Sequence, residues 1–425
     1  MSKIERLRGF KDYYPEDMQK REEIFSIMRN AAKSFGFLPI DYPSLEMLEI
    51  YRIKSGDELV GQTYNFKDKS KREITLIPEA TPSTMRMLVS RKDLVKPVKW
   101  YNIPKLWRYE EPQSGRNREH YQFNADYFGE TGIEIDAELI ALACETLNRM
   151  GLKGMYVVRV NHRKLMEKIL SKLGCVNIQS SISTIDHFRK ESIETIGNKL
   201  RDDGVVDDNL NRLLNFLSKS YPVSEIQNSI KDLGLDLLED EDFLRMISTV
   251  EFLFKNGYED IVYDPSTVRG LSYYTGIVFE GFDVDGKFRS IFGGGRYDNL
   301  SQLFEGQEIP AVGFGMGDAV LENLLKEKNL WKVDNGHSSY FLVGMGREGK
   351  NKAANLLYKL RRNGKTAVME NSERNISNSL KHASSMNFTH AIIIGEKELT
   401  ERSLTIKNLI NGEQKKIGEN ELDEL

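Results

Sequence analysis

Arginine and aromatic residues lie close together along residues 106–118, a pattern that could bind phosphate. Arg108 follows Trp107 in a strand-like stretch, and Arg116 and Arg118 come next on a polar loop. A charge held within a strand needs a partner, and a guanidinium group can bind two phosphate oxygens at once. The loop arginines can reach a polyphosphate or the end of an RNA. Taken one at a time, each loop arginine is more simply interpreted as a solvated surface charge.

Two pairs of polar residues have the spacing of ligand-binding side chains. Gln122 and Asp126 are four residues apart on an expected strand, so they share a face, and polar residues there indicate a pocket. Glu79 and Thr81 are two residues apart in a stretch expected to be extended, which places a carboxylate and a hydroxyl on one side. That pair could hold an ammonium group. The alternative for Thr81 is the N-cap of a helix over residues 82–88.

Two glycine-rich regions could bring backbone close to a ligand. Residues 269–276 (RGLSYYTG) combine one arginine with two tyrosines, whose flat rings can form walls with polar tips. Residues 292–298 (FGGGRYD) and 313–317 (GFGMG) would let a nucleotide lie against glycine-rich strand ends. Neither region is a P-loop, which needs a final Lys-Ser/Thr, nor a dinucleotide-binding GxGxxG turn. Any nucleotide site must therefore be of another kind.

The elements that must position these segments follow from hydrophobic periodicity. Apolar residues recurring near every 3.6 positions predict helices, and short stretches rich in aromatic and β-branched residues predict strands. Pro39 and Pro43 favour an edge or interface strand over a central one. The expected helices are 16–35, 136–150 and the end of 311–325, and the expected strands are 37–43, 99–109, 121–128, 157–160, 261–263 and 277–282, with a hairpin loop at 110–119.

Changes in composition divide the chain into three expected parts. Residues 170–235 are charged, helical and poor in aromatics, which predicts an insertion between two pieces of one main domain, 1–169 and 236–330. A turn signal at 334–336 marks a linker, and residues 337–425 alternate strands and helices. That alternation predicts a small α/β domain with a mostly parallel sheet.

Composition also narrows the class of protein. The chain has 425 residues and a net charge of −4, so nucleic acid could be bound only through local patches. The cysteines, Cys144 and Cys175, form no CxxC pair, and the histidines lack metal-ligand spacing. The N-terminus is too charged for a signal peptide, and no apolar run approaches a membrane span. We expect a cytoplasmic protein with no membrane segment and no metal site formed by a protein motif.

In order and spacing, these segments resemble the class II aminoacyl-tRNA synthetases, and within that class the histidyl-tRNA synthetase family. The resemblance covers nearly the whole chain and rests on several matches rather than one. The matching positions are 8–12 (N-terminal signature), Pro43 (motif 1), 78–81 (Pro-Glu-Gly-Thr, with Ala80 for glycine), 108–110 (motif 2), 269–276 (histidine-specific signature) and 390–412 (anticodon-binding domain).

The resemblance implies a fold and a reaction. The fold would be of α/β class, with an α+β catalytic domain built on an antiparallel sheet flanked by helices, a helical insertion, and a C-terminal α/β domain of anticodon-binding type. The activity would be that of a histidine–tRNA ligase. Histidine would react with ATP to give histidyl-adenylate and pyrophosphate, and would then pass to the 3′ end of tRNA(His). Mg²⁺ would be carried with ATP, and the chain would form a homodimer.

Roles for individual residues follow from the same resemblance. Arg108 and Arg269 would be catalytic, stabilising charge at the α-phosphate, and Asp126, where the family usually has glutamate, would contact the imidazole. Gln113 would approach the acceptor end of the tRNA. The histidine-binding residues would be Glu79, Thr81, Gln122, Asp126, Tyr273 and Tyr274, and the ATP-binding residues would be Arg108, Glu110, Arg116, His120 and Arg269.

The chain departs from the family pattern at further positions. Ser272 stands where aspartate is usual, and His120 stands where phenylalanine commonly stacks on adenine. Val320 occupies the position of the arginine that ends motif 3. One ATP contact must then come from another residue, for which Arg116 and Arg296 are the candidates.

A second interpretation belongs to another functional class. A synthetase-like, non-catalytic regulatory subunit of histidine biosynthesis keeps the same fold and can bind histidine. The departure at Val320 favours that interpretation. Arg269 and the C-terminal domain, which such a subunit typically lacks, argue against it. A charging assay with total tRNA separates the two.

Overall fold

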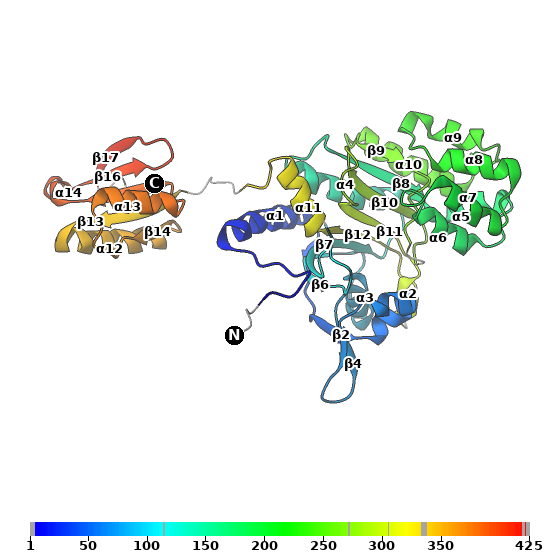
Figure 1. Cartoon of the computed structure of the whole chain (residues 1–425), viewed down its shortest axis with the longest axis horizontal. Helices are drawn as coiled ribbons and strands as arrows, with labels where there is room; N and C mark the ends of the chain where they lie inside the picture. The colour runs from blue at the N-terminus through cyan, green and yellow to red at the C-terminus, as the bar shows by residue number, and fades with distance from the viewer. Residues whose placement is uncertain are drawn as a thin grey trace. The chain divides into compact units, whose positions relative to one another are not determined.

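The computed structural model describes residues 5–113, 115–270, 273–304, 306–332, 338–418 and 421, with backbone alone at 54–58 and 207. The chain divides into two compact units, Met1–Lys332 and Val333–Leu425 (Figure 1). The linker expected at 334–336 lies outside the described residues. Among the residues described, no helix is long and apolar enough to cross a membrane.

The first unit is built on a nine-stranded sheet with the order β1-β5-β7-β12-β11-β10-β8-β9, to which β6 adds by pairing with β7. Its central pairs are antiparallel, and only the outer pairs β1·β5 and β8·β9 are parallel. The bounds are β1 Leu38–Pro39, β5 Val98–Asn102, β6 Lys105–Trp107, β7 Glu119–Phe128, β8 Tyr156–His162, β9 Ile261–Tyr263, β10 Ile277–Asp283, β11 Phe292–Arg296 and β12 Ala311–Gly317. The expected antiparallel sheet flanked by helices is confirmed, and the proline-containing strand β1 lies at an edge.

Helices cover one face of this sheet. Helix α4 (Ile133–Arg149) packs against β7, β11 and β12, while α1 (Pro15–Ser34) and α10 (Glu241–Lys255) pack against α4. Phe123, Ala125 and Tyr127 of β7 belong to this core. Because side chains alternate along a strand, Gln122 and Asp126 face the opposite side, which is open to a ligand. Helix α11 (Asp318–Glu327) follows β12 directly, as the pattern at 311–325 predicts.

A smaller sheet stands beside the large one. Its order is β2-β4-β3, formed by Leu45–Met47, Glu73–Leu76 and Asn65–Lys67, and it accompanies α2 (Glu49–Gly61) and α3 (Thr81–Ser90). Ala80, not Thr81, is the N-cap residue of α3, so the N-cap interpretation of Thr81 is wrong. Residue 80 is also helical in backbone conformation, and Glu79 and Thr81 do not lie in an extended stretch.

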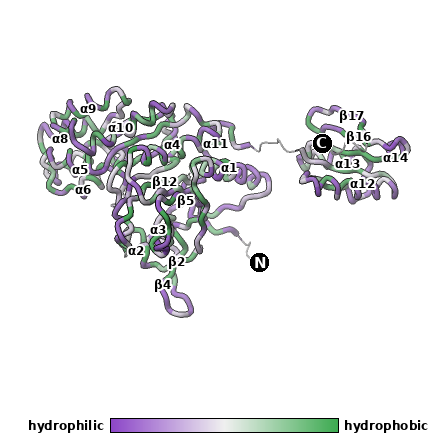
Figure 2. Tube along the Cα trace, turned by 180° about the vertical axis from the view of Figure 1, so that it is seen from behind, coloured by the Kyte–Doolittle hydropathy of each residue, from purple (hydrophilic) through white to green (hydrophobic). Residues whose placement is uncertain are grey.

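A group of helices follows β8. Three of them are capped by side chains that accept a backbone N–H: His162 for α5, Asn177 for α6 and Ser192 for α7. In Figure 2 hydrophobic and hydrophilic stretches alternate along these helices, as expected where each has one apolar face. The boundaries of the insertion at 170–235 stay a prediction. The bounds are α5 Arg163–Lys172, α6 Ile178–Asp186, α7 Ile193–Asp202, α8 Asp207–Leu217, η1 Val223–Glu225 and α9 Ile226–Asp232.

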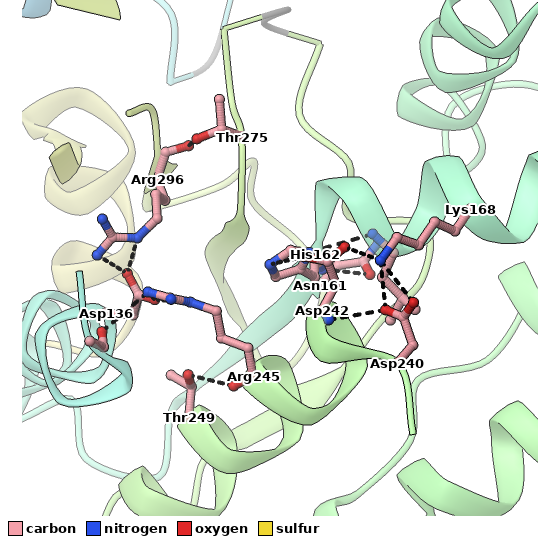
Figure 3. A network of polar contacts seen from close by, with 12 residues as sticks. Asp136, Asn161, His162, Lys168, Asp240, Asp242, Arg245, Thr249, Thr275 and Arg296 are labelled. Atoms are coloured by element: carbon pink, nitrogen blue, oxygen red, sulfur yellow. Dashed lines mark hydrogen bonds and ion pairs between the residues drawn. The ribbon is translucent and has the colours of Figure 1, made fainter. Parts of the chain in front are cut away.

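Buried ion pairs connect the helical layer to the sheet. Asp136 of α4 accepts hydrogen bonds from Arg296 Nε of β11 at 2.7 Å and from Arg245 Nη2 of α10 at 2.8 Å (Figure 3). Arg296 is also paired with Asp298 at 2.9 Å. A buried arginine with two carboxylate partners is fixed as part of the core, so Arg296 is not available to a ligand.

The second unit is an α/β domain. Its sheet has the order β14-β13-β15-β16-β17, in which the first three strands are parallel and the last two form an antiparallel hairpin. The parallel strands were expected, but the hairpin was not. The bounds are β13 Ser339–Gly344, α12 Gly346–Arg362, β14 Thr366–Met369, α13 Ile376–Ser385, β15 His390–Ile394, α14 Glu396–Glu401, β16 Ser403–Asn408 and β17 Gln414–Gly418.

Candidate active site

A cavity of about 400 Å³ opens on the face of the large sheet that lies opposite α4. Strands β7, β10, β11 and β12 contribute to its walls. The other walls come from residues 108, 110, 115–117, 269, 273–274 and 289–291. The sequence-predicted residues that line it are Glu79, Thr81, Arg108, Glu110, Arg116, His120, Gln122, Asp126, Arg269, Tyr273 and Tyr274. Of the site residues expected from the sequence, Gln113 is the one that lies outside this lining.

Glycines in the central strand β12 make room for polar side chains of the neighbouring strand β7. Gly313 lies opposite Asp126 in the register, and a Cβ at Gly313 would approach within 2.7 Å of the Tyr297 hydroxyl and closer to Asp126. Gly315 lies opposite Asn124 in the register, and a Cβ at Gly315 would lie 2.8 Å from Cδ of Gln122. Both glycines lie within β12, and their absent side chains leave the space that Asp126 and Gln122 occupy.

Asp126 is buried and accepts a hydrogen bond from the Tyr297 hydroxyl. Burial, with the charge of Asp126 adding, raises the pKa of Tyr297 well above its usual value, so this phenol stays protonated and donates. Gln122 hydrogen-bonds Asn124, whose amide nitrogen donates to Asn102 Oδ1 at 3.0 Å. The floor of the cavity is thus a chain of polar groups with fixed orientations.

Arg269 and Glu280 form an ion pair in the wall of the cavity, with Nη1 and Oε1 at 2.5 Å. Arg269 has a φ of 56°, in the left-handed region that a non-glycine residue rarely adopts. Such a conformation persists only where the surroundings hold it. Tyr273 and Tyr274 lie next to it, with ring centroids 4.7 Å apart. Ser272 lies outside the described residues.

Arg108 directly follows β6 instead of lying within a strand. Its Nε donates to the carbonyl oxygen of Pro78 at 2.9 Å, and Arg108 forms no ion pair with any described residue. This bond connects Arg108 to the segment that carries Glu79. Arg108, expected at the α-phosphate, and Glu79, expected at the amino group, are therefore positioned relative to each other by this hydrogen bond.

Glu110, Arg116 and His120 also line the cavity. Arg116 pairs with Glu110 through Oε2, while the buried Glu110 Oε1 has no hydrogen-bond partner among the described residues. A buried acceptor without a donor is costly, and the amino group of a bound adenine would supply one. Burial, with Arg108 and Arg116 adding, lowers the pKa of His120 to about 3, so its ring is neutral at physiological pH. A neutral imidazole is a flat surface for a base.

Several residues of the cavity were not expected from the sequence. Tyr297 lies in the FGGGRYD segment noticed for its glycines, but nothing local pairs it with Asp126. Glu280 is a single acidic residue on an expected strand, and only the fold shows that it pairs with Arg269. Arg289 also lines the cavity. Among the described residues, no group of three or more His, Cys, Asp or Glu could hold a metal ion.

Comparisons with known proteins agree over most of the chain. The family model of histidyl-tRNA synthetase matches residues 9–320, and that of an anticodon binding domain matches 340–425. The chain is 47% identical to the histidine–tRNA ligase of Thermoplasma volcanium over 411 residues, 97% of this chain and 95% of that protein. It is 46% identical to the histidine–tRNA ligase of Picrophilus torridus over 412 residues, 97% of this chain and 96% of that protein.

Solved structures show the same fold. The histidyl-tRNA synthetase of Nostoc sp. PCC 7120 superposes with a TM-score of 0.86 at 23% identity, covering 100% of this chain and 99% of that one. An ATP phosphoribosyltransferase regulatory subunit/histidyl-tRNA synthetase from Bacillus halodurans superposes with a TM-score of 0.76, also at 23% identity, covering 92% and 98%. At such identity these structures support the architecture and not the activity.

Proposed function

This chain belongs to the histidyl-tRNA synthetase family, and from that premise we propose that its cavity is the active site of a histidine–tRNA ligase. Histidine and ATP would react there to give histidyl-adenylate and pyrophosphate. The histidyl group would then pass to the 3′ end of tRNA(His). The observation that carries the proposal is that one cavity joins an acidic, hydrogen-bonded floor at Asp126 to arginines at Arg108 and Arg269.

The floor suits the side chain of histidine. The Asp126 carboxylate is oriented by Tyr297 and can accept the N–H of an imidazole. Glu79 and Thr81 line the same cavity and would hold the ammonium group. A site built to hydrogen-bond its substrate rejects analogues that lack the matching groups. No separate editing step is therefore needed to exclude aliphatic amino acids.

In the first step, a histidine carboxylate oxygen attacks the α-phosphorus of ATP in line, and the bond to the bridging oxygen of pyrophosphate breaks. The reaction needs positioning and charge stabilisation rather than a covalent enzyme intermediate. Arg108 and Arg269 would stabilise the negative charge that builds on the α-phosphate oxygens. In the second step, a ribose hydroxyl of the tRNA attacks the carbonyl carbon of the adenylate, and AMP leaves.

Adenine would lie between His120 and the carboxylate of Glu110. The Glu110 Oε1 atom would accept from the adenine amino group, which satisfies a buried acceptor. Mg²⁺ would be carried into the site with the phosphates of ATP. Bound in that way it would neutralise phosphate charge.

The partners follow from both units. The C-terminal unit, which matches an anticodon-binding model, would bind the anticodon stem of tRNA(His), and Gln113 at the rim would approach the acceptor end. We also propose a homodimer through the segment around Pro43, where Pro43, Leu45 and Met47 are exposed. We propose a cytoplasmic location, because tRNA is charged there.

Histidine-dependent ATP–pyrophosphate exchange, followed by charging of total tRNA, tests the proposal. Arg269→Ala should lower the exchange rate by roughly 10²–10³ and leave the fold intact by circular dichroism. Near-normal exchange in this variant would refute the role of Arg269. If the wild-type protein binds histidine but neither exchanges pyrophosphate nor charges tRNA, the regulatory-subunit interpretation replaces the ligase.

A further inference from the structure

Arg289 is an exposed arginine on the loop between β10 and β11, and its side chain lines the cavity. Its Nη2 donates to Oε1 of Gln113 at 2.8 Å. Among the residues that the structure describes, this neutral amide is its only polar partner, and no carboxylate pairs with it. A guanidinium has five N–H donors in a planar fork, so the bond to Gln113 leaves most of its hydrogen-bonding capacity for a ligand.

Two arginines of the cavity are already paired with carboxylates, whereas Arg289 pairs with no described carboxylate. Arg116 is paired with Glu110 and Arg269 with Glu280, so part of the positive charge of each is already balanced by a carboxylate. Arg108 and Arg289 are the cavity arginines that form no ion pair with a described residue. A triphosphate carries several negative charges, and charge-assisted bonds to unpaired guanidinium groups are the strongest that this cavity can offer it.

The position of Arg289 fits the far end of the triphosphate. Gln113 and Arg116 are joined as a β-bridge that closes a tight turn, and Arg289 binds this turn through Gln113. Val320 reaches the same turn from α11, since its Cγ2 would lie 3.1 Å from a Cβ at Gly115. The family resemblance leads us to expect an arginine at the position of Val320. Arg296, one candidate to replace that arginine, is buried in ion pairs.

We propose that Arg289 binds the terminal phosphates of ATP and supplies the positive charge that Val320 does not. This inference rests on the proposed function and adds a phosphate-binding residue to it. The side chain enters from the β10–β11 loop, on the cavity side of the Gln113–Arg116 turn. Binding of ATP and of pyrophosphate should both depend on Arg289, whereas binding of AMP and of histidine should not.

The test is direct binding of ATP and of AMP by isothermal titration calorimetry, together with the exchange assay. Arg289→Ala should weaken ATP binding roughly ten- to hundredfold and raise the KM for pyrophosphate similarly, with AMP binding and the KM for histidine within about twofold of wild type. Arg289→Lys keeps the charge but loses the planar fork, so its affinity for ATP should lie between those of the wild type and Arg289→Ala.

Lys287→Ala is the matched control, because it removes a positive charge from the same loop at a residue that pairs with Glu327 outside the cavity. It should leave ATP binding unchanged. Unaltered ATP affinity in Arg289→Ala, or an equal loss of ATP and AMP affinity, overturns the assignment of Arg289. Absence of histidine-dependent exchange in the wild-type protein would instead overturn the proposed function, so the two failures are distinguishable.

Discussion

Replacing Gly293 by alanine should displace the guanidinium of Arg269 while leaving the residue at position 269 unchanged. Gly293 lies in β11 opposite Glu280 of β10, the ion-pair partner of Arg269. A Cβ at position 293 would lie 2.8 Å from Cζ of Arg269 and closer to its Nη1. Carbon atoms in contact are normally about 3.5–4.0 Å apart. The guanidinium must therefore move by about 1 Å, away from the place where charge develops on the α-phosphate.

A displacement of this size has a large kinetic cost and a small structural one. A shift of about 1 Å in a positioning group can lower a rate on the order of 10²-fold, which corresponds to about 3 kcal/mol of transition-state stabilisation. The clashing atoms are the end of a flexible side chain, so the fold can absorb the methyl group. We expect Gly293→Ala to lower the histidine-dependent exchange rate about 10²-fold while the melting temperature changes little.

A control variant and a double variant test whether the loss of activity acts through Arg269. Gly197→Ala, inside α7 and away from the cavity, is the control glycine and should keep wild-type exchange. If Gly293 acts only through Arg269, the double variant Gly293→Ala/Arg269→Ala should be no slower than Arg269→Ala alone, because both changes remove one interaction. Exchange within about threefold of wild type in folded Gly293→Ala would refute the reasoning, as would fully additive losses in the double variant.

Further measurements test the acidic floor and the buried histidine. Asp126→Asn keeps the shape but removes the carboxylate, so the KM for histidine should rise about ten- to hundredfold with that for ATP unchanged; a KM for histidine near the wild-type value would contradict the role of Asp126. Burial lowers the pKa of His162 to about 4, with Asp242 opposing it. The native state then binds fewer protons than the unfolded chain, so stability is complete above about pH 6.5 and is lost as the pH falls towards 4. Between about pH 6.5 and 4, the free energy of unfolding measured with urea should fall by about 3 kcal/mol more for the wild type than for His162→Asn, which retains an N-cap side chain for α5. The same pH dependence in both proteins would contradict this.

The sequence predicts those parts of the fold whose signal is local. The strand at 261–263 matches the predicted bounds because it is a short apolar run between turns. The hairpin of β16 and β17 was missed. Strand β17 (Gln414–Gly418) is mostly exposed and polar, so its place in the sheet comes from pairing with β16 and not from its own composition.

The candidate site was predictable in chemical type but not in its supporting contacts. Arginines, carboxylates and tyrosines that could face a ligand were recognisable from residue type and spacing. Their partners come from strands distant in sequence: Tyr297 is 171 residues from Asp126. Such pairs are set by strand order and register, which hydrophobic periodicity does not encode.

The glycines and arginines of the site show what the fold adds. The pattern at 292–298 and 313–317 was interpreted as room for a nucleotide beside strand ends, whereas the register gives that room to Asp126, Gln122 and Arg269. The same register turns Arg296 towards Asp136 and away from the ligand. The gap left by Val320 must then be filled from a loop, and loops carry no periodicity from which a direction could be inferred. Arg289 therefore becomes a candidate only once the Gln113–Arg116 turn is seen to lie beside it.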